Sequence, residues 1–305
     1  MFKYTLDNKR YHTLNYYYKN KYGKKTFKVS LNANFTCPNK INGKGCIFCS
    51  RLGSGDFAGN KEKDLITQFN EVKDIMEKKW PNSYYIGYFQ ANTNTFAPVN
   101  ILKEKYETIL NLPNVIGLNI ATRSDAITKE CYNYLEELNK KTDLIVELGL
   151  QSMHEKTLEF INRGHDLANF EKAVKELQKR HIKVVVHIIN GLPNETKEDM
   201  INTAKYLNKL NIDGIKIHML HILKNTDLED YYKLHPFHIL TKEEYIDIVI
   251  NQLEVLNDKI VIHRITGDPK KEDLIEPTWL LKKFCVLNDI DKEMKKRSTY
   301  QGKKA

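Results

Sequence analysis

Short apolar runs alternate with amphipathic stretches along most of this 305-residue chain. The apolar runs predict seven β-strands, at 28–33, 84–89, 115–120, 144–149, 183–189, 214–219 and 259–263. Between them, apolar residues recur at helical spacing and predict helices at 61–79, 100–110, 128–139, 155–162, 168–180, 196–209 and 241–257. A repeated strand–helix order is typical of a parallel α/β sheet, either open or curled into a barrel.

The strand candidates have the composition of a sheet that is covered on both faces. Leu144-Ile145-Val146 and Val184-Val185-Val186 are unbroken apolar runs rich in β-branched residues. No stretch rich in Pro, Ser or Gly interrupts the alternation, so we expect one main domain over 26–265. A short segment rich in Tyr and Lys precedes it at 1–25, and a more irregular, basic extension follows it at 266–305.

Composition and charge narrow the class of protein. Hydrophobic residues make up 41% of the chain and charged residues 29%, as in soluble globular proteins. The chain contains no apolar run long enough to cross a bilayer, and its first residues lack the apolar core of a signal peptide. We therefore expect a cytoplasmic protein without a membrane partner. The net charge of +9 weakly favours a polyanionic partner such as nucleic acid.

The run Tyr16-Tyr17-Tyr18-Lys19 allows two interpretations. Aromatic rings interleaved with cations can stack on bases and neutralise phosphates. The tyrosines can instead pack over one end of the barrel, and we favour this second interpretation.

Three of the five cysteines, Cys37, Cys46 and Cys49, lie close together in one loop that also contains Gly43 and Gly45. The two-residue spacing of Cys46 and Cys49 places both sulfurs on one ion or cluster. The other two cysteines are solitary. The loop therefore offers three ligands and leaves a fourth coordination position open, which is where metal centres carry out chemistry.

Two other uses of these thiols have to be weighed. A disulfide with a spare thiol requires an oxidising compartment, which nothing in the sequence indicates. A structural zinc site requires four ligands, and only one C-x-x-C pair is present, so a histidine would have to complete it. An iron–sulfur cluster with one uncommitted iron fits the ligand count best.

Polar residues gather where the predicted strands end, and in parallel α/β folds ligands bind at the carboxyl ends of the strands. Glu147 stands out, because a carboxylate within a buried strand is costly unless it meets a partner or a ligand. A single histidine at such a position is more often structural, but the recurrence of polar residues at nearly every strand end indicates a site. The candidates are Gln90, Glu147, Gln151, Arg163, His187, His218, His221, His263 and Arg264.

With these residues in place, the chain resembles the radical S-adenosylmethionine (SAM) superfamily, and within it the YhcC-like branch related to the elongator catalytic subunit. The resemblance spans nearly the whole chain. It is carried by the cysteine loop and by the motifs Glu147-Leu-Gly-Leu-Gln-Ser152, Asn162-Arg-Gly-His165, Gly191-Leu-Pro-Asn-Glu195 and Ile262-His-Arg-Ile-Thr-Gly-Asp268. Residues 38–45 make the cysteine loop longer than is common in the superfamily, and this branch carries such an enlarged loop.

The resemblance implies a partial (β/α)6 barrel with a 4Fe-4S cluster on Cys37, Cys46 and Cys49 and with SAM on the open iron. An electron passed into the cluster would release a 5′-deoxyadenosyl radical that abstracts hydrogen from a substrate. An external donor of the flavodoxin or ferredoxin type would supply that electron.

The resemblance also implies roles for the strand-end residues. Gln90, Glu147, Gln151, Arg163 and His187 would bind SAM, with Arg163 pairing to its carboxylate. An internal salt bridge between Glu147 and Arg163 is the structural alternative. His218, His221, His263 and Arg264 are then left for the substrate.

For the substrate, the resemblance points to tRNA, and specifically to a carboxymethylaminomethyl-type side chain on the wobble uridine. A small-molecule substrate is the enzymatic alternative. A zinc-stabilised basic module that binds RNA is the non-enzymatic one.

Overall fold

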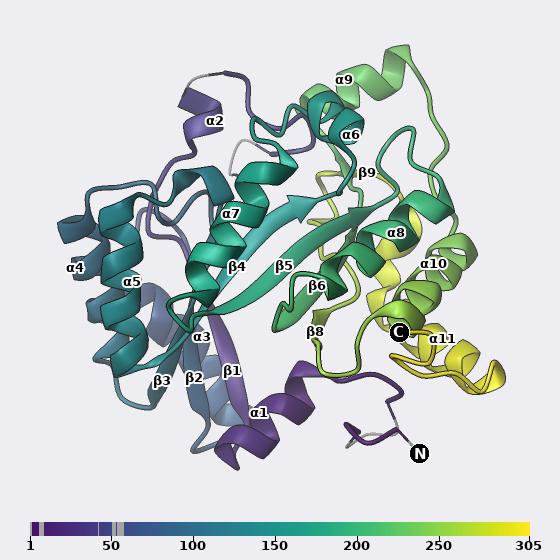
Figure 1. Ribbon diagram of the computed structural model, residues 1–305. Coiled ribbons are helices and arrows are strands. Elements are labelled where there is room, and N and C mark those ends of the chain that lie inside the picture. The colour runs from purple at the N-terminus through teal and green to yellow at the C-terminus, as the bar shows by residue number, and fades with distance from the viewer. Residues whose placement is uncertain (1, 6–8, 42, 51–52, 54–57) are drawn as a thin grey trace.

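The computed structural model of the protein describes residues 2–5, 9–41, 43–50, 53 and 58–305. Seven parallel strands form one curled sheet in the order β1-β2-β3-β4-β5-β6-β8 (Figure 1). Their bounds are β1 (Thr26–Leu31), β2 (Tyr84–Phe89), β3 (Val115–Thr122), β4 (Asp143–Gln151), β5 (Lys183–Asn190), β6 (Gly214–Met219) and β8 (Val261–Arg264). The predicted partial α/β barrel is confirmed, and the seventh strand extends it beyond six strand–helix units.

Helices follow the strands and cover the outer face of the sheet (Figure 1). They are α3 (Leu65–Lys79), α4 (Val99–Leu110), α5 (Lys129–Lys141), α7 (Leu167–Gln178), α8 (Lys197–Asn208) and α10 (Lys242–Val255), and each predicted helix overlaps an observed one. Most of them begin at a Thr or Asp whose side chain accepts a backbone N–H, as Thr196 and Thr241 do in full capping boxes. Within the described residues, no helix has the length and apolar character required to span a bilayer.

The main hydrophobic core lies between the sheet and these helices, and the apolar strand residues Val146 and Val186 are completely buried in it. A second, smaller cluster lies beneath the cysteine loop. It is built from Leu158, Ile161, Leu192, Leu220, Ile222 and Leu228, and Ile47 and Phe48 pack against it. The short helices α2 (Pro38–Ile41), α6 (Glu155–Phe160) and α9 (Asp227–Leu234) lie at this same end of the molecule (Figure 1).

The N-terminal segment closes the opposite end of the barrel. Helix α1 (Leu14–Tyr22) contacts both edge strands, β1 and β8, and Tyr18 is only 3% exposed. Lys21 and Tyr22 both contact Asp143, the first residue of β4. The packing interpretation of the tyrosines is therefore confirmed, and the segment also covers two sheet edges that would otherwise be open.

The C-terminal part is more regular than we expected. β7 (Ile222–Leu223) pairs antiparallel with β9 (Leu274–Glu276), and the helix α11 (Lys283–Lys296) packs on α10. Three residues of α11, Val286, Ile290 and Met294, belong to the main core. The expectation of an irregular extension is therefore wrong for 283–296. The basic C-terminal residues are also held in place, by a salt bridge between Lys304 and Glu254.

Candidate active site

A cavity of about 310 Å³ lies at the carboxyl ends of the strands, and residues of β1 to β6 and β8 line it together with the cysteine loop. It brings together eleven of the twelve predicted site residues, namely Cys37, Cys46, Cys49, Gln90, Glu147, Gln151, Arg163, His187, His218, His221 and Arg264. The exception is His263, which lies deeper in the barrel with its Nδ1 3.0 Å from the Nζ of Lys28.

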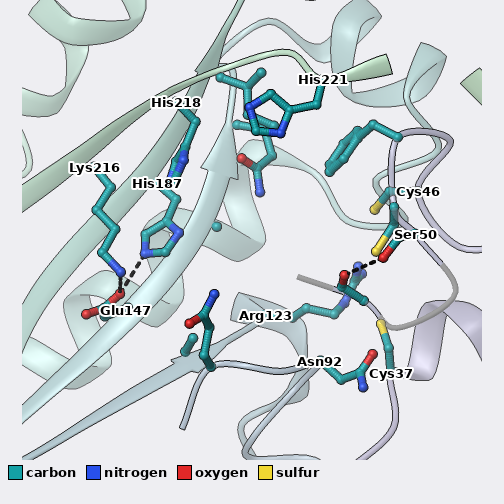
Figure 2. A pocket seen from close by; sticks show the side chains of 18 of the residues that line it. Cys37, Cys46, Ser50, Asn92, Arg123, Glu147, His187, Lys216, His218 and His221 are labelled. Carbon is teal, nitrogen blue, oxygen red and sulfur yellow. Dashed lines mark hydrogen bonds and ion pairs between the residues drawn. The ribbon is translucent and has the colours of Figure 1, made fainter. Parts of the chain in front are cut away.

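The cysteines occupy one end of this cavity (Figure 2). The backbone N–H of Cys49 donates to the carbonyl of Cys46 at 3.0 Å, and this tight turn carries both thiols. Ile47 and Phe48, between them, pack into the smaller hydrophobic cluster. The apolar pair thus anchors the turn from below while both cysteines line the cavity. Cys131 is buried on α5 and Cys285 is exposed on α11, and neither lines the cavity.

The motif at 162–165 holds the cysteine loop in place. Asn162 Nδ2 donates to the carbonyl of Gly45 at 2.6 Å, and Asn39 Nδ2 donates to the carbonyl of Asn162 at 2.8 Å. Gly164 has φ +76°, and a Cβ atom there would lie 2.5 Å from Asn39 Oδ1. A side chain at Gly164 would therefore push Asn39 out of the loop.

Arg163 is only 6% exposed and extends from this motif to the cysteines. Its Nη2 donates to the carbonyl of Gly149 at 2.6 Å, and its Nη1 lies 3.7 Å from Cys46 Sγ. The buried Nε–H has no hydrogen-bond partner within the described part of the chain. Arg163 makes no ion pair with Glu147 there, so the alternative of an internal salt bridge between them is wrong.

A β-bulge shapes the neighbouring wall of the cavity. The register between β4 and β5 shifts at Gly149 and Gln151, and Gln151 has φ 75°, which is strained for a residue other than glycine. A Cβ atom at Gly149 would lie 2.7 Å from Gln151 Nε2 and 2.9 Å from Arg163 Nη2. The glycine therefore leaves room for the two polar side chains to meet at the cavity.

Glu147 lies at the other end of the cavity, with its side chain completely buried among polar partners. Its Oε1 accepts from Lys28 Nζ at 2.8 Å and from Asn119 Nδ2 at 2.6 Å. Its Oε2 lies 2.5 Å from Lys216 Nζ and 2.8 Å from His187 Nε2 (Figure 2). One carboxylate is thus shared by two lysines.

This arrangement shifts the pKa of each member. Burial alone would raise the pKa of Glu147, but the charges of Lys216 and Lys28 lower it well below its usual range, so the carboxylate is ionised. Burial, together with repulsion from Lys28 and Arg264, lowers the pKa of Lys216 to about 7, even though the negative charge of Glu147 raises it. Burial and Lys216 together lower the pKa of His187 to about 4. His187 is therefore neutral at pH 7.

Comparison with known proteins identifies the family. The family model for the radical SAM superfamily matches residues 35–207, which is more than half of the chain. The family model for the radical SAM C-terminal domain matches residues 212–296. The chain belongs to the radical SAM superfamily. Members of this superfamily use a 4Fe-4S cluster and SAM, which confirms both predicted cofactors.

Relatives within the superfamily agree with the predicted branch. YtqA of Bacillus subtilis is 48% identical over 99% of this chain and 95% of its own length. YhcC of Escherichia coli is 29% identical over 89% of this chain and 88% of its own length. A tRNA uridine(34) acetyltransferase of Methanocaldococcus jannaschii is 26% identical over 50% of this chain, which spans only 28% of that protein.

The structure of the Elp3 protein of Methanocaldococcus infernus, determined with its N-terminus deleted, has the same fold. It superposes with a TM-score of 0.70 at 17% identity, over 91% of this chain and 64% of the Elp3 chain. The resemblance to the YhcC-like branch and to the elongator subunit is therefore confirmed.

The residues at the cysteine end fit the cluster that radical SAM enzymes use. Three free thiols line one cavity there, and the unpartnered N–H of Arg163 lies beside them. Burial raises the pKa of the Cys49 thiol to about 11, so ligation would have to displace its proton.

The sequence did not lead us to the two lysines that pair with Glu147. Lys28 and Lys216 lie inside apolar strands, and Lys216 is 6% exposed with its Nζ 2.8 Å from Tyr88 Oη. The signal that could have found them is the one that singled out Glu147, namely a charged residue within a buried strand. The turn at Gly191 and Leu192 lies outside the cavity lining, with Leu192 in the smaller hydrophobic cluster.

Proposed function

We propose that this radical SAM enzyme modifies the wobble uridine of tRNA, and that its substrate carries a carboxymethylaminomethyl-type side chain. The observation that carries the proposal is the joint position of the three clustered cysteines and Arg163 at one end of a cavity whose other end is lined by polar strand residues. Such a cavity places cluster ligands at one end and polar groups for a substrate at the other.

In this proposal Cys37, Cys46 and Cys49 bind the 4Fe-4S cluster. When bound, and with one electron from an external donor, the cluster and SAM would supply a 5′-deoxyadenosyl radical able to take a hydrogen atom from the substrate. Arg163 pairs with the carboxylate of SAM through the N–H that lacks a protein partner. Gln90 and Gln151 provide amide contacts from neighbouring strand ends.

The sequence led us to expect that Glu147 and His187 bind SAM directly. We propose an indirect role instead. The Glu147 side chain is completely buried and occupied by four partners, two of which are lysines. We propose that it positions Lys216 and His187, which in turn line the cavity.

The tRNA assignment rests on the family and on charge. One relative is a tRNA uridine(34) acetyltransferase, and the part of it that this chain matches is 28% of its length. The net charge of +9 suits an RNA partner. The N-terminal tyrosines provide no support, because α1 packs at the end of the barrel away from the cavity. We also propose a cytoplasmic location, an electron donor of the flavodoxin or ferredoxin type, and the division into 1–25, 26–265 and 266–305.

The test is transfer of deuterium from a labelled wobble uridine into 5′-deoxyadenosine by the reduced, anaerobic holoenzyme. We expect label transfer from tRNA that carries the carboxymethylaminomethyl group, and none from tRNA that carries unmodified uridine. If no tRNA donates label while a small metabolite does, the substrate assignment fails and the radical chemistry stands. If the purified protein binds zinc and no iron or sulfide, the enzymatic proposal fails as a whole.

A further inference from the structure

The end of the cavity opposite the cysteines, which we name the distal end, is defined by Glu147, Lys216, His218, His221 and Arg264. It holds more positive than negative charge. Lys28 and Lys216 share the single carboxylate of Glu147. The other acidic residue of the lining, Asp268, is paired with Lys283.

Arg264 adds a further cation that the protein does not neutralise. Arg264 is exposed and lines the cavity, and its guanidinium makes no hydrogen bond or ion pair with the described residues. Its charge acts on the neighbouring groups, because it contributes to lowering the pKa of both Lys216 and His221. The distal end therefore presents an arginine and a buried lysine whose charges are only partly compensated.

The two histidines of the distal end do not balance this charge. Both rings have a buried Nε2 without a hydrogen-bond partner in the described structure, and burial lowers the pKa of each. They are therefore neutral at pH 7. Their unpartnered nitrogens and the surplus cations together form a surface suited to a polar, negatively charged group.

This surface is separate from the place where SAM carries its own negative charge. SAM would be held at the cysteine end, where the cluster ligands lie and where Arg163, Arg123 and Lys40 supply positive charge. Figure 2 shows the cysteines on one side of the cavity and the group of Glu147, His187 and Lys216 on the other. The anion for the distal end must therefore come from the substrate.

We propose that Arg264, together with Lys216, binds a carboxylate on the substrate and so selects for substrates that carry one. This rests on the proposed function, in which the wobble side chain ends in a carboxymethyl group. A carboxylate suits the site better than a backbone phosphate. Lys216 is only 6% exposed and lies against the ring of Tyr88, with Nζ 4.2 Å from its centroid. A slender terminal group can approach such a site, whereas a phosphate within RNA is joined to the chain on both sides.

The first experiment asks whether the distal end binds an anion at all, whatever the substrate is. Crystals of the SAM-bound holoenzyme are soaked in sodium bromide, and bromide is located by anomalous scattering. We expect a bromide ion at Arg264 and Lys216 in the wild type and none there in Arg264→Gln. Bromide that appears only elsewhere, or at the same place in both proteins, overturns the assignment of Arg264.

The second experiment measures which anion the site selects. Anticodon stem–loops that differ only at the wobble position carry a carboxymethylaminomethyl or an aminomethyl group, and their affinity for the anaerobic holoenzyme is measured by fluorescence anisotropy. A charge-assisted pair corresponds to a preference of about 10- to 100-fold for the carboxylate. We expect Arg264→Gln to abolish the preference and Arg264→Lys to restore part of it.

A matched arginine controls for the loss of one positive charge. Arg297 on α11 pairs with Asp247 and Glu293 away from the cavity, so Arg297→Gln should keep the wild-type preference. If Arg264→Gln weakens both stem–loops equally, Arg264 binds RNA backbone and the carboxylate assignment is overturned. If uridine 5′-monophosphate competes as well as the carboxylate-bearing nucleoside does, the distal end is a phosphate site, which also overturns it.

The outcomes also separate this inference from the proposed function. If no wobble-modified tRNA is turned over while bromide still occupies the distal end only when Arg264 is present, the tRNA assignment fails and the anion site stands. If the modified tRNA is turned over but Arg264→Gln leaves the preference unchanged, the tRNA assignment stands and the role of Arg264 fails.

Discussion

Asn162 donates a hydrogen bond of 2.6 Å from its Nδ2 to the carbonyl of Gly45, which ties the turn after α6 to the loop that carries Cys46. The backbone of Asn162 is in the left-handed region with φ 50°, a conformation that asparagine tolerates better than most residues do. The side chain of Asn162 therefore holds the cysteine loop, and its backbone conformation forms the turn.

Two substitutions separate these roles. Asn162→Gly keeps the backbone conformation and removes the side-chain bond, so we expect the free energy of unfolding to fall by about 1–3 kcal/mol and the iron content to fall with it. Asn162→Ala should cost more, because it adds backbone strain. Chemical denaturation and iron analysis measure both effects. A glycine variant with wild-type iron content would show that the cysteine loop holds its shape without Asn162.

The cysteines give a direct test of the ligand set. Replacing Cys37, Cys46 or Cys49 by Ala should abolish the cluster, which in the wild type should amount to about four irons per chain with a broad absorption from thiolate ligation. Cys131→Ala and Cys285→Ala serve as matched controls, because neither residue lines the cavity, and both variants should keep the cluster. Loss of the cluster in either control would show that the three-cysteine assignment is wrong.

Arg163 should matter for SAM more than for the cluster. In Arg163→Ala we expect the iron content to stay and the affinity for SAM to fall about 10- to 100-fold, because a charge-assisted pair to the carboxylate is lost. Equilibrium binding to the unreduced holoenzyme measures this without turnover. Arg163→Lys keeps the charge but not the planar, bidentate donor, so its affinity should lie in between. Unchanged affinity in Arg163→Ala would remove this residue from the SAM site.

The sequence predicted the sheet and the cavity well because both follow from local patterns. Apolar runs marked every strand of the main sheet, and polar residues at their carboxyl ends marked the cavity. Helix α11 was missed because only a narrow stripe, Val286, Ile290 and Met294, faces the core and the rest of the helix is polar. That spacing of four was present in the sequence, but the irregular stretch before it obscured the pattern.

The partners of Glu147 could not be predicted from local patterns. Lys28 is on β1 and Lys216 is on β6, and neither strand is hydrogen-bonded to β4, which carries Glu147. The three side chains meet only because the sheet curls and brings inward-facing residues of distant strands together. The alternative pairing of Glu147 with Arg163 was wrong for the same reason. The curl of the sheet decides which side chains reach Glu147, and closeness along the sequence does not.

The position of α1 changes the expected effect of altering the N-terminal segment. If the aromatic and basic residues of this segment bound RNA, removing it would weaken RNA binding and leave SAM cleavage intact. Because Tyr18 is buried where α1 covers both sheet edges, we now expect Tyr18→Ala to lower the free energy of unfolding by about 3–5 kcal/mol. Chemical denaturation measures this. The exposed neighbour Lys19 is the control, and Lys19→Ala should change neither stability nor affinity for tRNA. Weaker tRNA binding by Lys19→Ala at unchanged stability would show that the N-terminal segment is part of the RNA interface.

The charge on Lys216 should make recognition of the carboxylate depend on pH. Burial and the charges of Lys28 and Arg264 lower the pKa of Lys216 to about 7, so its ammonium loses the proton as the pH rises above 7. A neutral amine attracts a carboxylate less. The KM for the carboxylate-bearing substrate should therefore rise between about pH 6.5 and pH 8.5, by up to about tenfold per pH unit above the pKa.

The carboxyl, imidazole and phenol groups around Lys216 do not titrate in this range, which limits the dependence to the lysines. Glu147 is ionised throughout because its pKa is well below its usual range, and His187 has a pKa of about 4. Burial lowers the pKa of His218 and His263 well below 6.5 and raises that of Tyr88 well above 10. Burial also lowers the pKa of Lys28, but this residue pairs with Glu147 and is not among the residues that line the cavity. The matched control is the aminomethyl substrate, which lacks the carboxylate and should show a flatter KM profile over the same range. Parallel profiles for the two substrates would mean that Lys216 does not contact the carboxylate.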